Sequence, residues 1–183
     1  AVATAFALAV TYPEAGNLGG GGFMVVGMGG GTTAALDFRE KAPLGATRDM
    51  FIGPDGDVDE NLSLWSHQAS GVPGAVMGLW TAHQRFGRLP WRDVVAPAIR
   101  IAREGFAVNE RFGRVIEGHR ERFAPHPASM AYMMPGGVAP APGTHWSNPH
   151  LPPTLERIAA EGADGFYRGA TADMIVAEME RGG

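Results

Sequence analysis

Arg39 is the residue whose type and position best suit ligand binding. It follows an apolar run, Thr32–Phe38, that contains the acidic Asp37, and Glu40 comes next. An arginine just past a strand end presents a planar fork of N–H groups, which can clamp a substrate carboxylate through two parallel hydrogen bonds. The same residue types also form ordinary ion pairs with Asp37, Glu40 or another acid. The spacing alone slightly favours such an ion pair over the clamp.

Four consecutive glycines, Gly19–Gly22, lead into a second apolar run, Phe23–Met28. Glycine lets backbone approach backbone, or a ligand, where a Cβ would block the approach. Nucleotide-binding loops follow a strand and open a helix. Here a helical stretch comes first, a strand follows, and no Gly-Lys-Ser/Thr is present. The order disfavours nucleotide binding and predicts close backbone packing, with a contribution to a pocket wall as the second interpretation.

The remaining polar residues do not form a recognisable catalytic or metal-binding motif. Ser70 lacks the G-x-S-x-G pattern of a nucleophile elbow. Asp55, Asp57 and Asp59 alternate as in a calcium loop, but the glycine and the distal glutamate are out of register, which favours a solvated turn. No HExxH or HxH pair occurs among the six histidines, which are His67, His83, His119, His126, His145 and His150. We therefore expect no catalytic residue, no metal and no cofactor in this chain.

Two further features have ordinary structural interpretations. His83 falls on the apolar face of an expected helix and is better explained as a packed residue than as a ligand. The methionine-rich segment Met130–Met134 is better explained as an apolar anchor of a loop than as a cofactor site.

Composition excludes several classes of protein. The 183 residues carry a net charge of −4, so no basic surface for nucleic acid is expected. No apolar run approaches the roughly 20 residues of a membrane-spanning helix. Cysteine is absent, which excludes disulfides and thiol catalysis but leaves the compartment open. The first residues resemble the middle of a helix rather than a signal peptide, so the chain is expected to be a fragment of a longer polypeptide.

Hydrophobic periodicity predicts helices around a single hairpin. The two apolar runs are expected to pair through the turn at Gly29–Gly31, with the first strand buried on both faces. Residues 42–70 and 125–149 are expected to be irregular. The expected helices cover residues 1–11, 75–86, 90–104, 109–122, 152–162 and 169–181. The first should be buried on all sides, and the last should turn Ala172, Ile175, Val176 and Met179 inward. The helix over 90–104 carries an apolar stripe, and Gly105 is expected to cap its C-terminus. The stripe consists of Val94, Val95, Ala98, Ile99 and Ala102. A two-stranded hairpin is not stable alone in water, and nothing after Phe38 is expected to form a strand, so its partner strands should lie outside the chain.

The chain resembles the N-terminal part of the large subunit of γ-glutamyltranspeptidases. Each matching segment is modest alone, but together they occur in family order across nearly the whole chain, with Pro125–His150 departing most. The segments are Ala1–Tyr12, Pro13–Met24, Leu36–Pro43, Ala46–Phe51, Ser70–Gly74, Pro97–Ala98, Ala102–Phe106 and Gly165–Gly169.

The resemblance implies an α/β fold, part of a four-layer αββα N-terminal-nucleophile hydrolase sandwich, with residues 1–183 as one incomplete domain. Such enzymes are zymogens that cleave themselves into a large and a small subunit, and the new N-terminal threonine of the small subunit attacks the γ-glutamyl amide of glutathione. The family's carboxylate-binding arginine maps to Arg39, which shifts the balance from ion pair to clamp. The nucleophile would lie in the small subunit, which is the expected partner. The family also suggests a periplasmic or extracellular location.

Three alternatives remain at this point. A cephalosporin acylase or a poly-γ-glutamate transpeptidase would share the fold but use another acyl substrate. A non-catalytic binding or scaffold module could contain this half of the fold without the nucleophile.

Overall fold

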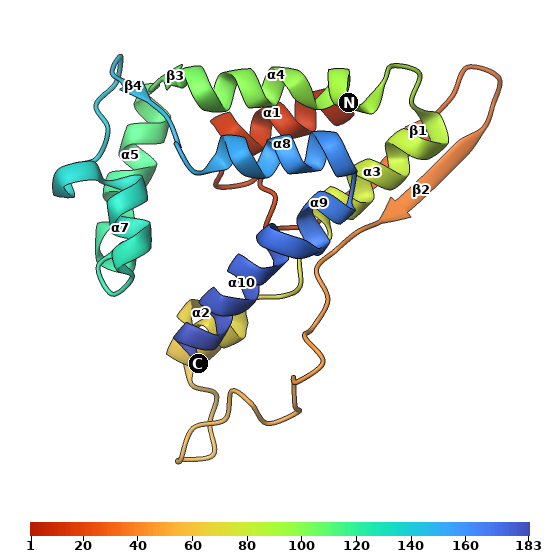
Figure 1. The fold of residues 1–183 in the computed structure, drawn as a ribbon. Helices are drawn as coiled ribbons and strands as arrows, with labels where there is room; N and C mark the ends of the chain where they lie inside the picture. Colours follow the sequence, from red (N-terminus) through yellow and green to blue (C-terminus); the bar gives the residue numbers. More distant parts are fainter.

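A layer of helices forms the centre of the structure (Figure 1). The computed structural model describes all residues from Ala1 to Gly183. Three helices lie side by side in this layer, α1 (Val2–Thr11), α4 (Trp91–Glu104) and α8 (Leu151–Glu161). Two more, α3 (Ala75–Phe86) and α9 (Asp164–Tyr167), extend the layer toward the hairpin. No helix is both long and apolar enough to cross a membrane.

The main hydrophobic core joins these helices. Fourteen buried residues contribute to it, and Phe6, Val95 and Leu155 have no exposed surface. The Trp91 indole lies edge-on to Phe6 at 5.5 Å, and its Nε1–H donates to the Ile158 carbonyl at 2.7 Å. The indole is therefore buried without leaving its N–H group unpaired. These contacts connect α1, α4 and α8.

Helix α4 follows its sequence pattern closely. Val94, Val95, Ala98 and Ala102 are buried, as the predicted stripe requires. Gly105 ends the helix with a φ of 76°, a conformation that favours glycine.

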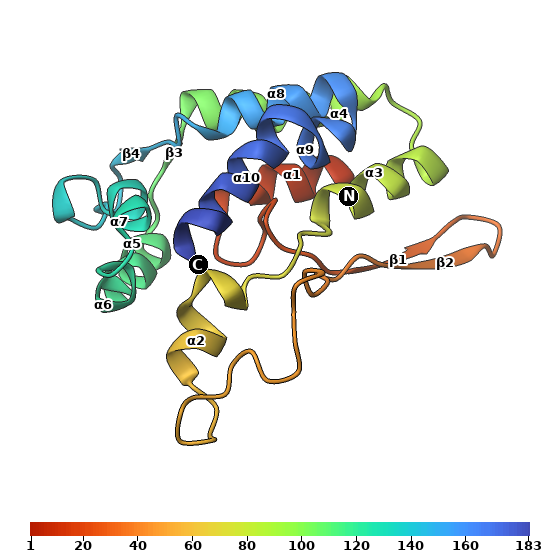
Figure 2. The same ribbon diagram turned by 60° about the horizontal axis from the view of Figure 1, so that its bottom comes forward.

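The hairpin consists of β1 (Phe23–Gly27) and β2 (Thr33–Asp37), paired antiparallel as predicted. Its inward face places Met24 and Leu36 against the helices. Its outward face leaves Phe23 68% and Val25 75% exposed. Figure 2 shows the hairpin beside the helices with its other face open. The expectation that β1 is buried on both faces is wrong for this chain, because only one face has a layer against it.

Helix α1 is likewise buried on one side only. Phe6, Ala9 and Val10 are buried, whereas Leu8 is 44% exposed. The expectation of burial on all sides is therefore wrong for this chain.

A second, smaller apolar cluster lies at the other end of the helical layer. Its residues come mainly from β3 (Phe106–Ala107), α5 (Glu110–Gly118), α6 (Arg120–Phe123), α7 (Pro127–Met133) and β4 (His145–Trp146). A short 3₁₀ turn, η2 (Pro135–Gly137), follows α7. Trp146 packs against Phe106 and Phe112, and Met134 is almost fully buried. The anchoring role predicted for Met130–Met134 is confirmed.

This cluster corrects three expectations. The single helix expected over 109–122 is divided at His119. The loop expected over 125–149 contains α7 and β4, and β4 pairs with β3 although no strand was expected after Phe38. Tertiary packing around Trp146 orders these segments, which have weak local periodicity.

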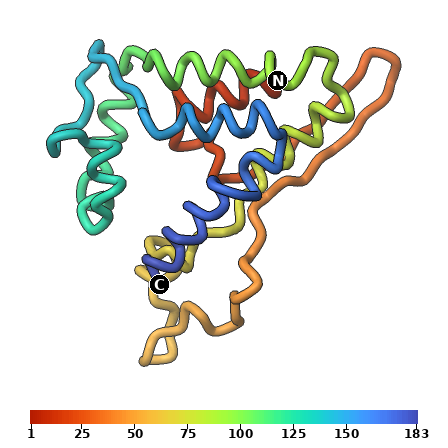
Figure 3. The backbone as a smooth tube through the Cα atoms, viewed as in Figure 1, coloured from red at the N-terminus to blue at the C-terminus, as the bar shows by residue number.

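The C-terminal helix α10 (Gly169–Gly182) leaves the layer and reaches a short helical segment, α2 (Glu60–Trp65) and η1 (His67–Ala69), as Figure 3 shows. His67 Nε2 lies 3.0 Å from Glu178 Oε1 there. Residues 42–70 are thus partly helical rather than wholly irregular. The face of α10 expected to be inward is only partly covered, and Val176 is 53% exposed. All four of these residues, Ala172, Ile175, Val176 and Met179, line an open cavity.

Candidate functional site

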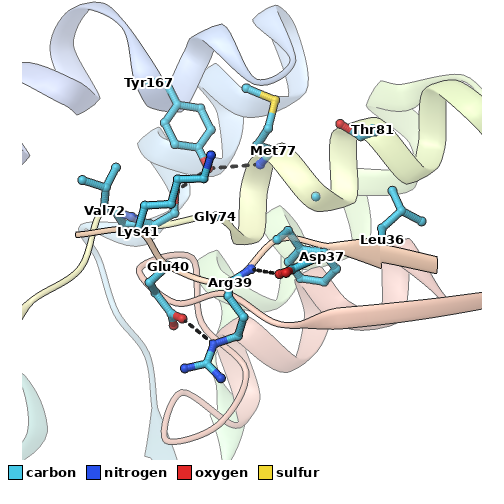
Figure 4. A pocket seen from close by; sticks show the side chains of 13 residues that line it. Leu36, Asp37, Arg39, Glu40, Lys41, Val72, Gly74, Met77, Thr81 and Tyr167 are labelled. Atoms are coloured by element: carbon cyan, nitrogen blue, oxygen red, sulfur yellow. Dashed lines mark hydrogen bonds and ion pairs between the residues drawn. The ribbon is translucent and has the colours of Figure 1, made fainter. Parts of the chain in front are cut away.

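A cavity of about 540 Å³ opens where the hairpin meets α3 (Figure 4). The end of β2 and the residues after it form one wall, the start of α3 forms a second, and α9 contributes Tyr167. Its lining comprises Leu36, Asp37, Phe38, Arg39, Glu40, Lys41, Val72, Pro73, Gly74, Met77, Gly78, Thr81 and Tyr167.

Arg39 lies on the outward side of the hairpin. Its guanidinium is 5.8 Å from the exposed Phe23 ring, and Figure 4 shows its side chain directed away from Met77 and Thr81. Its Nε–H donates to Glu40 Oε2 at 3.0 Å. The side chain is 62% exposed, and its two terminal nitrogens make no hydrogen bond to the protein. The fork that a carboxylate would require is therefore still available.

The two acids beside Arg39 have different functions. Asp37 Oδ1 accepts a hydrogen bond from the Arg39 backbone N–H at 3.0 Å, which holds the main chain rather than the guanidinium. Glu40 pairs with the guanidinium. Its own backbone N–H and the Arg39 side chain together keep the pKa of Glu40 below its usual value. The carboxylate is consequently charged near neutral pH, and it orients Arg39 without occupying the whole fork.

Three glycines from separate segments allow the close packing around Phe38 and Arg39. A Cβ on Gly21 would lie 2.5 Å from the Phe38 carbonyl oxygen, and one on Gly74 would lie 2.1 Å from the same atom. A Cβ on Gly78 would lie 2.1 Å from Cγ of the Phe38 ring. The sequence prediction of close backbone packing is confirmed. It applies to Gly74 and Gly78 as well as to the tract at Gly19–Gly22.

Backbone hydrogen bonds fix the segment that carries Arg39 from both sides. The Phe38 N–H donates to the Gly22 carbonyl at 2.9 Å. Lys41 and Val72 exchange two hydrogen bonds, of 3.2 and 2.7 Å. Arg39 therefore has an exposed guanidinium on a fixed backbone, which is the arrangement needed to place a charged fork reproducibly.

Tyr167 joins the site from α9. Its hydroxyl donates to the Pro73 carbonyl at 2.9 Å and accepts from the Met77 N–H at 3.1 Å. Burial raises the pKa of Tyr167, and the Met77 N–H opposes part of that rise. The hydroxyl therefore stays protonated near neutral pH and can make both hydrogen bonds.

The other sequence candidates lie away from this cavity. His83 Nε2 is 2.8 Å from the Leu89 carbonyl oxygen and its ring packs on Trp91, so the interpretation as a packed residue is confirmed. The aspartates at 55–59 form the expected turn, in which Asp55 accepts from the Asp57 N–H. Asp59 accepts from two N–H groups at the start of α2. No group of three His, Cys, Asp or Glu side chains is placed to hold a metal ion.

Sequence reasoning gave no role to Lys41, Met77 or Tyr167. Tyr167 lies in the segment Gly165–Gly169, which contributed to the family resemblance, but its contact with the start of α3 has no local signal. A hydroxyl that bonds to backbone groups far away in sequence can be found only from the fold.

Comparison with known proteins identifies the class. The family model described as Gamma-glutamyltranspeptidase matches residues 1–183. The "Glutathione hydrolase proenzyme" of Pseudomonas aeruginosa is 48% identical over 99% of this chain, and that of Escherichia coli K12 is 44% identical over 100% of it. The chain belongs to the γ-glutamyltranspeptidase family. It spans about a third of the length of these curated relatives, 32% of each.

Solved structures agree with this assignment. The γ-glutamyltranspeptidase of Helicobacter pylori superposes with a TM-score of 0.95 at 40% identity, covering 98% of this chain and 52% of that one. A cephalosporin acylase from Bacillus halodurans superposes less closely, with a TM-score of 0.84 at 27% identity, covering 99% of this chain and 34% of that one. The mixed α/β fold is therefore shared with γ-glutamyltranspeptidases and with related acylases.

Proposed function

We propose that this chain is part of a γ-glutamyl-transferring hydrolase that acts on glutathione and related γ-glutamyl compounds. In this proposal Arg39 binds the α-carboxylate of the γ-glutamyl group. The observation that carries it is the exposed Arg39 guanidinium on a fixed backbone, with both terminal nitrogens free. The names of the P. aeruginosa and E. coli relatives support the substrate class. A bidentate, partly desolvated pair of this kind contributes about 1.5–3 kcal/mol.

The remainder of the precursor would supply the chemistry. A threonine at the N-terminus of the small subunit attacks the γ-carbonyl carbon, and its own α-amine takes the hydroxyl proton. The C–N bond breaks, and the proton passes to the leaving amine. Water or an amino acid then attacks the glutamyl ester and regenerates the threonine. The residues of this chain bind and orient the donor, and none of them is assigned a catalytic role.

The open face of the hairpin supports a particular place in the whole enzyme. Arg39 and the exposed Phe23 and Val25 lie on the same side of β1 and β2. We expect strands from the remainder of the precursor to cover this face and to complete a four-layer αββα sandwich. Residues 1–183 would then form part of one domain, and the nucleophile would approach Arg39 from the side of these added strands.

The test uses the full-length, mature protein and a γ-glutamyl anilide as donor. Arg39→Lys keeps the charge but cannot reproduce the planar fork. We expect a rise in the KM for the donor of about tenfold or more, equal to about 1.4 kcal/mol of lost binding, with a smaller change in kcat. Arg48→Lys is the control, because Arg48 is a strongly exposed arginine outside the cavity. An unchanged KM in Arg39→Lys rejects the role assigned to Arg39.

Two alternatives give different results in the same assay. A cephalosporin acylase would retain full turnover with donors that lack an α-carboxylate. This alternative has less support than the γ-glutamyl-transferring hydrolase, because the chain is less similar in sequence to the B. halodurans acylase than to the H. pylori γ-glutamyltranspeptidase. A scaffold module would show no turnover in the full-length protein. We expect the 183-residue chain alone to be inactive, and measurable hydrolysis by the pure chain would contradict that.

A further inference from the structure

The N-terminus of α3 has no capping side chain of its own. Its N-cap residue is Gly74, which offers no side-chain oxygen to the first free N–H groups of the helix. A serine, aspartate or asparagine cannot take its place, because a Cβ there would lie 2.1 Å from the Phe38 carbonyl oxygen. The close approach that holds the strand end therefore excludes the usual cap.

Groups from elsewhere in the chain replace the missing cap. The Gly20 carbonyl accepts from the N–H groups of Gly74 and Ala75, both at 2.9 Å. The Tyr167 hydroxyl accepts from the Met77 N–H at 3.1 Å and donates to the Pro73 carbonyl at 2.9 Å. The hydroxyl thus binds one backbone group on each side of Gly74.

The segment that Tyr167 holds is also the wall against which Phe38 rests. Gly74 contacts the Phe38 main chain, and Gly78 receives the Phe38 ring. Phe38 directly precedes Arg39, so the position of this wall sets the position of the Arg39 backbone. Tyr167 itself lies on the opposite side of the wall from the Arg39 guanidinium (Figure 4).

We propose that Tyr167 is a positioning residue for donor binding, whose hydroxyl fixes the start of α3 and thereby the placement of Arg39. The proposal rests on the proposed function of Arg39. It assigns to a tyrosine that does not contact the donor a specific part in recognising the α-carboxylate. This role requires a side chain that donates one hydrogen bond and accepts another at the same time, and phenylalanine has no hydroxyl to do so.

Tyr167→Phe in the mature full-length enzyme is the first test, with the γ-glutamyl anilide as donor. The ring stays in place and only the two hydrogen bonds are lost. We expect the KM for the donor to rise roughly three- to tenfold with kcat changed less than about twofold, as for the loss of a binding contribution. Tyr132→Phe is the matched control, since Tyr132 is another half-buried tyrosine, located in the smaller cluster. It should leave both constants unchanged.

The second test asks whether Tyr167 acts through Arg39. In an Arg39→Gln background, Tyr167→Phe should raise the KM further by less than about twofold, because coupled residues do not contribute additively. A full additional increase would overturn the proposal. So would a fall in kcat at constant KM, or a Tyr167→Phe enzyme that fails to mature while Tyr132→Phe matures, since either outcome indicates a structural role.

The two hypotheses fail in distinguishable ways. If Arg39→Gln alone leaves the KM unchanged, the carboxylate clamp is wrong and the role of Tyr167 is lost with it. If Arg39→Gln raises the KM but Tyr167→Phe does not, the clamp stands and only the positioning role is rejected.

Discussion

Leu155 and Val25 are both branched aliphatic residues, but their surroundings differ completely. Leu155 is fully buried in the helical layer, whereas Val25 on β1 is 75% exposed. The helices cover one another's apolar faces, and the hairpin has only one covered face. The candidate site lies at the boundary of these two regions. Its base is held by the covered side, and the Arg39 guanidinium extends on the open side.

The difference explains how one segment can be both fixed and accessible. Phe38 faces α3 and is held by Gly74 and Gly78, whereas Arg39, the next residue, faces outward. Alternation along an extended segment places neighbouring side chains on opposite sides. The helical layer can thus fix the backbone of Arg39 without enclosing its guanidinium.

The largest expected effect comes from a substitution in the core of the helical layer, compared with one on the open face of the hairpin. Phe6→Ala removes a fully buried ring from between α1 and α4. It should lower the free energy of unfolding by about 3–5 kcal/mol, measured by urea denaturation of the 183-residue chain at a concentration at which sedimentation shows it to be monomeric. Val25→Ala in the same chain should change it by less than about 0.5 kcal/mol. Similar losses from both variants would contradict the contrast between the two regions.

Gly78→Ala tests the boundary itself. The new Cβ would overlap the Phe38 ring, so the ring or the strand end must move. Overpacking of this kind should cost about 1–3 kcal/mol, and the full-length enzyme should show a raised KM for the donor. Gly45→Ala is the control, because nothing lies within 4 Å of the position of its Cβ. Equal unfolding midpoints for the two variants would show that Phe38 is not tightly held.

The open face of the hairpin should cause the isolated chain to associate. Val25→Lys places a charge on that face and should weaken self-association roughly tenfold, the equivalent of about 1.5 kcal/mol of lost apolar burial. Sedimentation velocity over a range of concentrations measures this. Val138→Lys is the control, since Val138 is 66% exposed but lies outside the hairpin. A monomeric wild-type chain at all concentrations would count against an unpartnered face.

The smallest expected effect lies at the end of α10. Hydrogen bonds from Arg181 and then from His67 lower the pKa of Glu178 to about 2. Because this pKa is below its ordinary value of 4.5, the charged Glu178 favours the folded state at neutral pH. That contribution should disappear as the pH falls from 4.5 toward 2, and exposure to solvent keeps it small.

Thermal unfolding of Glu178→Gln across pH checks this. The variant should melt slightly below the wild type near pH 6 and converge with it at low pH. Glu180→Gln serves as the control, because Glu180 forms no ion pair. A constant difference at every pH would show that the ion pair is not responsible.

Hydrophobic periodicity predicts those helices whose buried face is marked by an apolar stripe in their own sequence. The stripe on α4 and the end of the helix at Gly105 are predictable because the same residues determine both local structure and packing. The smaller cluster was missed because Phe106, Phe112 and Trp146 come together only through tertiary contacts. The expectation that β1 is buried on both sides is wrong for a different reason. No helix or strand of this chain packs against its apolar outer face.

The surroundings of Arg39 are predictable in part. The position of Arg39 after a strand follows from the sequence, and its pairing with Glu40 was among the expected ion pairs. The sequence does not predict that Asp37 binds the Arg39 backbone N–H whereas Glu40 binds the guanidinium, because both acids lie within reach of the guanidinium. The Tyr167 hydroxyl bonds to two backbone groups from a distant segment, and no local pattern predicts these hydrogen bonds.

Lys41 is the only lysine among these 183 residues. It is exposed and lies in the wall of the cavity, two positions from Arg39. Its Nζ is therefore the only side-chain amine in these residues that an amine-directed reagent can modify. A fluorophore or a fluorinated tag placed on Lys41 would report directly on occupancy of the cavity. Because the basic residues are otherwise all arginines, the one reactive side-chain amine lies two positions from the proposed binding residue.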